Sequence, residues 1–259
     1  MFIDNLGFTE ALLVFAAAIL TYAGLAVWWT MRKNDPERVR GALRGLAFPV
    51  GIVGFTALVL GFWEEMVWPY PAAIGGYNIL FNDMTLLFGI VLLSLAAAAY
   101  LNLRLQYVGI FAFVAGAVVL FYGWTGYHYA YTLDPLDTLL LYGAYGLAGI
   151  LALPATIVVD YYLNTVSKSE TAWRSTTTTP SRRGALGVRA AQSIGLAAVG
   201  PTNTPNTEVS TMTSLRYRMP IYVQLIVLAF PVIIALAGIA AWWYLGTTIP
   251  GHLIPGKTP

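Results

Sequence analysis

Several side chains that could do chemistry lie near the ends of long apolar segments, on one set of connections. Glu64 and Glu65 are adjacent near the end of one segment, and Asp83 begins the next. Carboxylate oxygens can bind a divalent cation, and a carboxyl group removed from water can hold a proton. The alternative is a solvated rim whose acids cap helix starts, as Asp83 and Asp137 would. The candidate polar cluster consists of Glu64, Glu65, Tyr77, Asn78, Asp83, His128, Asp134 and Asp137.

The two adjacent glutamates cannot both face the interior of a helix bundle, because neighbouring positions on a helix differ by about 100°. An acid at the centre of a bilayer costs about 2.5–3.5 kcal/mol, and less near the interface. Glu64 lies one helical turn before Trp68, an aromatic residue of the kind that prefers the membrane interface. We therefore expect one glutamate to be buried against polar partners and the other to be solvated.

The sequence lacks the residues that several well-known chemistries require. It has no cysteine, which excludes disulfides, thiol nucleophiles and thiolate metal sites. A retinal protein needs a lysine inside an apolar segment, and Lys33, Lys168 and Lys257 all lie outside these segments. A two-histidine haem site would need His252, which lies in a Gly/Pro-rich tail. The serine-hydrolase, Walker and zinc-protease motifs are also missing. We predict no catalytic residue, no metal ligand and no cofactor.

The elements that must position these residues are helices in a membrane. The chain is 58% hydrophobic and 10% charged, against about 45–50% and 25% in soluble domains. A bilayer core about 30 Å thick needs about 20 apolar residues in a helix. We predict an all-α, polytopic transmembrane bundle of six helices, whose segments are residues 8–31, 45–68, 83–103, 106–124, 137–162 and 220–245.

The basic residues indicate the orientation of this bundle. Thirteen of the 14 lysines and arginines follow the first, third and fifth segments, and only Lys257 lies on the other side. Loops rich in lysine and arginine stay in the cytoplasm. Five or seven spans would break this segregation. The pattern predicts that the amino and carboxyl termini both lie on the outer side of the membrane. We expect this membrane to be the cell membrane.

The composition also divides the chain. We predict a five-span region over residues 1–163, a sixth span over 219–246 and an outer tail over 247–259. Between them, residues 164–218 form a basic, Ser/Thr/Pro-rich cytoplasmic loop, which we expect to be largely disordered. A weakly amphipathic stretch over residues 182–199 could lie on the anionic inner leaflet, and a solvated linker is the alternative.

One stretch of the chain carries a family resemblance. It consists of Trp63-Glu64-Glu65, the Pro-Tyr that follows, and Tyr77-Asn78-Ile79-Leu80-Phe81-Asn82. In these residues the chain resembles DUF981, a family of predicted archaeal and actinobacterial membrane proteins of unknown function. The likeness extends over the first five spans. It implies a multi-span membrane protein, and it transfers no catalytic residue.

Three functions remain open. The first is a non-enzymatic membrane component, such as an accessory subunit of a larger complex, because the span centres are apolar and small residues mark helix contacts. The expected contact residues are Ala112 and Gly116 in the fourth segment and Gly143, Gly146 and Gly149 in the fifth. The second is a transporter or channel for a small solute or ion, with an acidic outer vestibule and prolines in three spans. The apolar span centres count against ion coupling. The third is an enzyme acting on lipid or quinone at the outer leaflet.

The expected partners follow from the same features. They are the lipid bilayer, other membrane subunits and further copies of the chain. Nothing in the sequence indicates nucleic acid.

Overall fold

The structure is a computed structural model that describes residues 5–69, 78–132, 134–177 and 220–253. The described residues contain α-helices and one short π-helical turn, without strands. In chain order the elements are α1 (Asn5–Arg32), α2 (Pro36–Val67), η2 (Asn78–Asn82), α3 (Asp83–Leu101), α4 (Gln106–His128), α5 (Pro135–Thr177) and α7 (Ile221–Leu253). The all-α prediction is confirmed.

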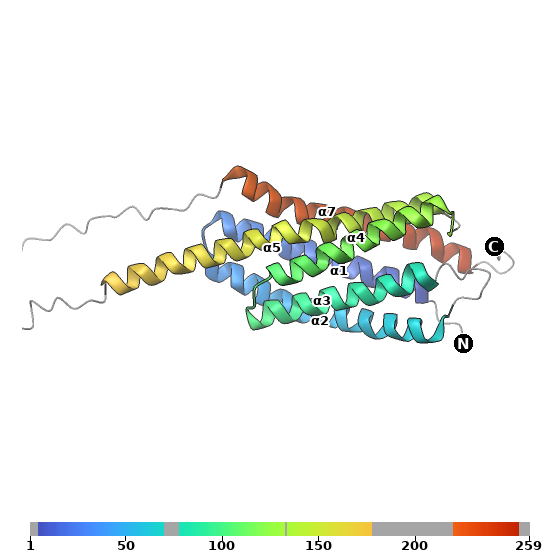
Figure 1. The fold of residues 1–259 in the computed structure, drawn as a ribbon, viewed down its shortest axis with the longest axis horizontal. Helices are drawn as coiled ribbons and strands as arrows, with labels where there is room; N and C mark the ends of the chain where they lie inside the picture. Colours follow the sequence, from blue (N-terminus) through green and yellow to red (C-terminus); the bar gives the residue numbers. More distant parts are fainter. Residues whose placement is uncertain (1–4, 70–77, 133, 178–219, 254–259) are drawn as a thin grey trace, which may run out of the picture. The chain divides into compact units, whose positions relative to one another are not determined.

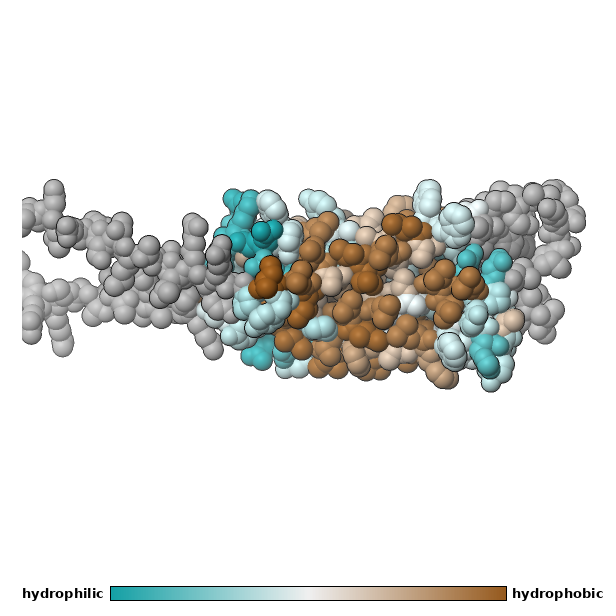
Figure 2. All heavy atoms as spheres, turned by 90° about the horizontal axis from the view of Figure 1, so that it is seen from above, coloured by the Kyte–Doolittle hydropathy of each residue, from teal (hydrophilic) through white to brown (hydrophobic). Residues whose placement is uncertain are grey.

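The chain forms two compact units, Met1–Leu163 with Met219–Pro259 and, separately, Asn164–Arg218. In the first unit the helices lie side by side (Figure 1). All six α-helices contain a stretch long and apolar enough to cross a membrane. Figure 2 shows a hydrophobic band between more polar ends, and large side chains such as Phe48 and Tyr22 are exposed. In water such a surface would be unstable, so lipid must cover it. The protein is a multi-pass membrane protein.

The two ends of the bundle differ in charge. The acidic end contains the start of α1, the end of α2 and the start of α3, with Glu64, Glu65 and Asp83. The basic end contains Arg32, Lys33 and Arg104. Arg32 and Lys33 lie over the rings of Trp28 and Trp29, at 5.0 and 4.9 Å from the ring centroids. These cation–π contacts hold both charges at the helix end.

Three helices extend beyond the segments that hydropathy predicts. α2 begins at Pro36, nine residues before position 45, because proline suits the first helical position and the Asp35 side chain accepts a hydrogen bond from the Arg38 N–H at 3.0 Å. α5 continues to Thr177, past the expected boundary at 163, and α7 continues to Leu253, past 246. Hydropathy marks where a helix leaves the apolar layer of the membrane. The helix itself ends only where its backbone hydrogen-bond pattern stops. The predicted disorder over residues 164–218 is wrong for residues 164–177, which continue α5 as helix. Residues 178–218, with the leaflet contact predicted over 182–199, lie outside the described residues.

Glycines bring two pairs of helices into backbone contact. A Cβ atom at Gly61 of α2 would lie 2.5 Å from the Leu86 nitrogen of α3. A Cβ atom at Gly149 of α5 would lie 2.8 Å from the Gly116 Cα of α4. The expected contact faces at Gly116, Gly146 and Gly149 are therefore confirmed. Gly143 was expected to join them and does not, since nothing lies within 4 Å of its Cβ position.

Candidate functional site

A π-helical turn forms the centre of the acidic end. η2 consists of Asn78-Ile79-Leu80-Phe81-Asn82 and leads directly into α3. Four of its five residues are buried, with Ile79 the exposed one. Single π-turns next to α-helices are frequent at functional sites. The turn coincides with the sequence element that carries the family resemblance.

Side chains from neighbouring helices hold this turn by its backbone. The Tyr142 hydroxyl of α5 donates to the Leu80 carbonyl at 2.6 Å, and the Thr85 hydroxyl donates to the Phe81 carbonyl at 2.7 Å. In the other direction, the Asn82 side-chain amide donates to the Glu64 backbone carbonyl of α2 at 3.0 Å. The turn therefore connects α2, α3 and α5.

Three carboxyl groups and a phenol meet beside the turn. Glu64 is only 1% exposed. The side chains of Glu65 and Asp83 are hydrogen-bonded to each other, and the Tyr122 hydroxyl of α4 donates to Asp83 Oδ2 at 2.8 Å. The charges of Glu64 and Glu65 act on each other. We call Glu64, Glu65, Asp83 and Tyr122 the carboxyl cluster. It joins α2, α3 and α4.

The structure brings together part of the candidate polar cluster. Glu64, Glu65 and Asp83 converge, and Asn78 is buried in the adjoining turn. His128 is exposed and stacks on Trp124, with ring centroids 6.3 Å apart. Asp134 is exposed, and Asp137 lies in the first turn of α5. Tyr77 lies outside the described residues.

Two expectations about the acids were wrong. Glu65 was expected to be solvated if Glu64 was buried, yet it is partly buried and bonded to Asp83. The reason is that α2 meets both η2 and the start of α3, so Glu64 lies near Asn82 while Glu65 reaches Asp83. Asp83 was also interpreted as a helix cap. The N-cap of α3 is Asn82, without a side-chain capping bond, and the Asp83 carboxylate is bound by Tyr122 instead.

Three residues of this end were not among the candidates predicted from the sequence. They are Tyr122, Asn82 and Glu10, and Glu10 is fully buried in α1. A signal was present for Glu10, because it lies two residues inside an apolar segment that begins at Phe8. Nothing in the sequence pairs Tyr122 with Asp83.

The carboxyl cluster consists of three acids and a phenol. Among the described residues, no group of three or more His, Cys, Asp and Glu side chains is arranged to hold a metal ion. Both ion pairs of the described part, Arg38–Asp35 and Arg40–Glu37, lie near the basic end. No basic side chain in that part pairs with the cluster.

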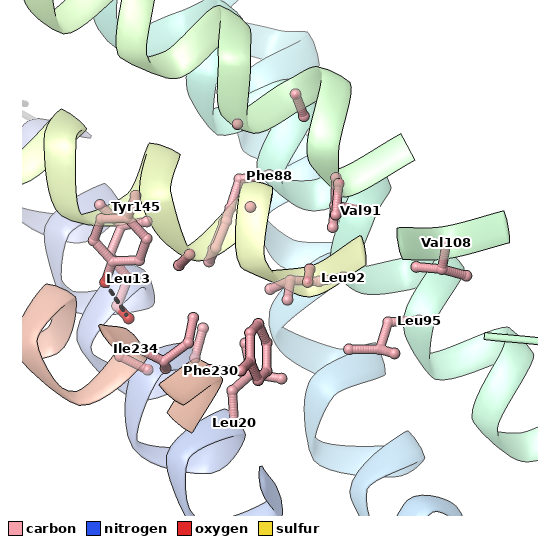
Figure 3. Close-up of a pocket in the computed structure, with 18 of the residues that line it drawn as sticks. Leu13, Leu20, Phe88, Val91, Leu92, Leu95, Val108, Tyr145, Phe230 and Ile234 are labelled. Atoms are coloured by element: carbon pink, nitrogen blue, oxygen red, sulfur yellow. Dashed lines mark hydrogen bonds between the residues drawn. The ribbon is translucent and has the colours of Figure 1, made fainter. Parts of the chain in front are cut away.

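A cavity of about 220 Å³ lies between the helices. Figure 3 shows its apolar wall, with Phe88, Leu95 and Val108 on one side and Leu20, Phe230 and Ile234 on another. Glu10 and Thr9 line it toward the acidic end, as do Phe81 and Met84. The residues of the carboxyl cluster are not in its lining.

The polar groups of the cavity wall are few and mostly occupied. The Tyr145 hydroxyl donates to the Leu13 carbonyl at 3.0 Å, and the Thr85 hydroxyl to the Phe81 carbonyl. The Thr156 hydroxyl donates to the Leu153 carbonyl at 2.9 Å. These three hydroxyl groups therefore donate their protons to backbone carbonyls of the bundle. The ionisable carboxyl group in the cavity lining is that of Glu10.

Comparison with known proteins gives a family and no activity. No curated protein and no solved structure matches the chain. A family model described as "Protein of unknown function (DUF981)" matches residues 1–167. The match covers α1 to α4, the carboxyl cluster, η2 and most of α5, and leaves α7 outside. The match includes more than half of the sequence, so the chain belongs to the DUF981 family.

Proposed function

We propose that the protein is a non-enzymatic membrane component that holds an apolar molecule, such as a lipid or isoprenoid chain, between its helices. The cavity of about 220 Å³ carries this proposal. Apolar space between packed helices that stays unfilled forfeits packing contacts, so an occupant is favoured. Water is a poor occupant, because it needs two to four polar partners.

The cavity wall supports binding more than chemistry. Three of its hydroxyl groups, on Tyr145, Thr85 and Thr156, donate to backbone carbonyls. The remaining wall consists mostly of aliphatic and phenylalanine side chains. Sites for small molecules are predominantly apolar, with a few polar groups that orient the ligand. Glu10 and Thr9 supply that polar end here, so the occupant is an apolar chain whose polar end points toward Glu10.

Extraction of bound lipids tests the proposal. The protein is purified both in lipid nanodiscs and in mild detergent. Each preparation is extracted with organic solvent, and the extract is analysed by mass spectrometry. We expect an apolar species in stoichiometric amount. Val108→Trp places an indole in the cavity and should reduce retention at least several-fold. Val114→Trp is the matched control, because Val114 is on the same helix and 55% exposed. Equal retention in both variants would refute the proposal.

An acidic vestibule for transport has less support. That hypothesis needs the acids to open into a path through the bundle. The carboxyl cluster and the cavity are instead separate, with Phe81 in the cavity wall and its neighbour Asn82 outside it. Phe81 and Tyr142 contact edge to face at the boundary, with centroids 6.1 Å apart.

We also propose that the protein associates with another membrane subunit or a second copy through α2. Gly41 and Gly45 are one helical turn apart and exposed, and nothing lies within 4 Å of either Cβ position. Small residues at this spacing allow close approach of another helix. Gly41→Leu with Gly45→Leu should shift the complex to smaller mass in native mass spectrometry. Gly246→Leu, at another open position, should leave the mass unchanged.

The proposed location is the cell membrane, with the acidic end outside. The support is the basic end, where Arg32, Lys33, Arg38, Arg40, Arg44 and Arg104 gather, because such residues remain on the cytoplasmic side.

A further inference from the structure

The carboxyl cluster contains buried oxygen atoms that have no hydrogen-bond donor. Glu64 Oε2, Glu65 Oε1 and Asn82 Oδ1 are all buried, and none has a hydrogen-bond partner among the described residues. Glu64 and Asn82 are 1% and 0% exposed. The oxygens of an ionised carboxylate and of an amide only accept hydrogen bonds. The carboxyl cluster and Asn82 therefore lack donors rather than acceptors.

Charge considerations point the same way. Three ionised carboxylates would place three negative charges together without a basic partner in the described part of the chain, and the charge of Glu64 would lie away from water. A buried carboxylate without compensation is very costly, and such a group takes up a proton instead. Protons on the carboxyl groups would supply the missing donors.

The hydrogen bonds identify where the protons are. A bond between two carboxyl groups needs one proton, and Tyr122 already donates to Asp83 Oδ2, which makes Asp83 the acceptor. The proton is therefore on Glu65. Glu64 is buried beside Glu65 and has no donor for Oε2. We propose that the carboxyl cluster is a proton-binding site that holds two protons, one on Glu64 and one on Glu65, which donates it in a hydrogen bond to Asp83.

The groups that face this site all come from the acidic end. α2 contributes Glu64 and Glu65, α3 contributes Asp83, and α4 contributes Tyr122. α1, which packs against α2, carries the buried Glu10 at the same end. With two protons bound, Tyr122 and Glu65 both donate to Asp83. Release of the protons would leave negative charges on α2 that repel the carboxylate on α3.

Infrared spectroscopy of the full chain in nanodiscs tests the site directly. At neutral pH a solvated carboxyl group is ionised, because its pKa is about 4. We expect a carbonyl band of protonated carboxylic acids that shifts in deuterated water. Glu64→Gln and Glu65→Gln should each reduce this band, and the double variant should reduce it further. Asp134→Asn, at an exposed acid of the same end, should leave it unchanged. An unreduced band in both glutamine variants would overturn the proposal.

A second measurement uses the unaltered chain and does not depend on folding of a variant. Because the folded state holds protons that the unfolded state lacks, its thermal unfolding midpoint should fall as the pH rises. Glu64→Gln with Glu65→Gln should flatten this dependence, and Asp134→Asn should preserve it. Added Na⁺, Mg²⁺ or Ca²⁺ should not move the midpoint beyond a general salt effect. Stabilisation by one of these ions that the double variant abolishes would show a metal site and refute the proton site.

Discussion

The hydroxyl of Tyr142 on α5 donates a hydrogen bond of 2.6 Å to the backbone carbonyl of Leu80 in η2. The two residues are 62 positions apart, and both are buried. The Tyr142 ring also contacts Phe81 edge to face. This pair attaches the π-turn to a helix that follows it by two spans, and Tyr142 also lines the cavity.

Loss of this hydroxyl should loosen the acidic end. Tyr142→Phe leaves the ring contact and removes the donor to a buried carbonyl, which costs about 1–3 kcal/mol. We expect a lower unfolding midpoint in detergent or nanodiscs and faster hydrogen exchange in η2. Tyr161→Phe is the control, because Tyr161 is on the same helix and 61% exposed. Equal stability of the two variants would mean that the bond contributes nothing.

The basic end has a corresponding link between α5 and α4. Asp160 of α5 is buried, and its Oδ2 accepts a hydrogen bond of 2.8 Å from the backbone N–H of Gln106, the first residue of α4. The carboxylate therefore acts as an N-cap supplied by another helix. Asp160→Ala should destabilise the protein by about 1–2 kcal/mol, and Asp160→Asn by less, since an amide oxygen also caps helices. Denaturant titration measures both, and an Ala variant as stable as the Asn variant would contradict this role.

The contact between α4 and α5 depends on a missing side chain. A Cβ at Gly149 would lie 2.7 Å from the Ala112 carbonyl oxygen and 2.8 Å from the Gly116 Cα, both backbone atoms that cannot move alone. Gly149→Ala should therefore cost about 1–3 kcal/mol through overpacking. Gly143→Ala, on the same helix with open space around it, should be neutral or slightly stabilising because alanine favours helix. The thermal unfolding midpoints of the two variants measure this difference, and equal midpoints would contradict the prediction.

The orientation of the chain can be tested with single cysteines, because the sequence contains none of its own. Gly76→Cys falls between α2 and α3 in the sequence, and Thr178→Cys falls after α5, so the predicted topology assigns the two positions to opposite sides of the membrane. In intact cells, a membrane-impermeant maleimide should label the first and reach the second only after permeabilisation. Labelling of both from the same side would refute the six-span topology.

The membrane architecture was predictable because it depends on local composition. Each span is long and apolar enough to cross a bilayer, and a backbone in lipid must satisfy its own hydrogen bonds. The basic residues beside Arg32 and Arg104 separate one end from the other in the same way. For the same reason, Glu64, Glu65 and Asp83 could be placed at a common end before their contacts were known.

The arrangement within that end was not predictable, because it depends on how helices rotate against each other. Period and hydropathy assign Tyr122 to an interface and Asp83 to a helix start, and only packing brings the hydroxyl to 2.8 Å from the carboxylate. The π-turn at Asn78–Asn82 and the burial of Glu10 arise in the same way.

The amino-acid sequence by itself determined that six apolar helices cross a membrane and that acids and bases separate to opposite ends, because both follow from transfer of single segments between water and lipid. The tertiary structure alone decided which acids meet and which glycines touch backbone, and where a cavity remains. Those features depend on the rotation and spacing of whole helices, to which residues far apart in the chain contribute together.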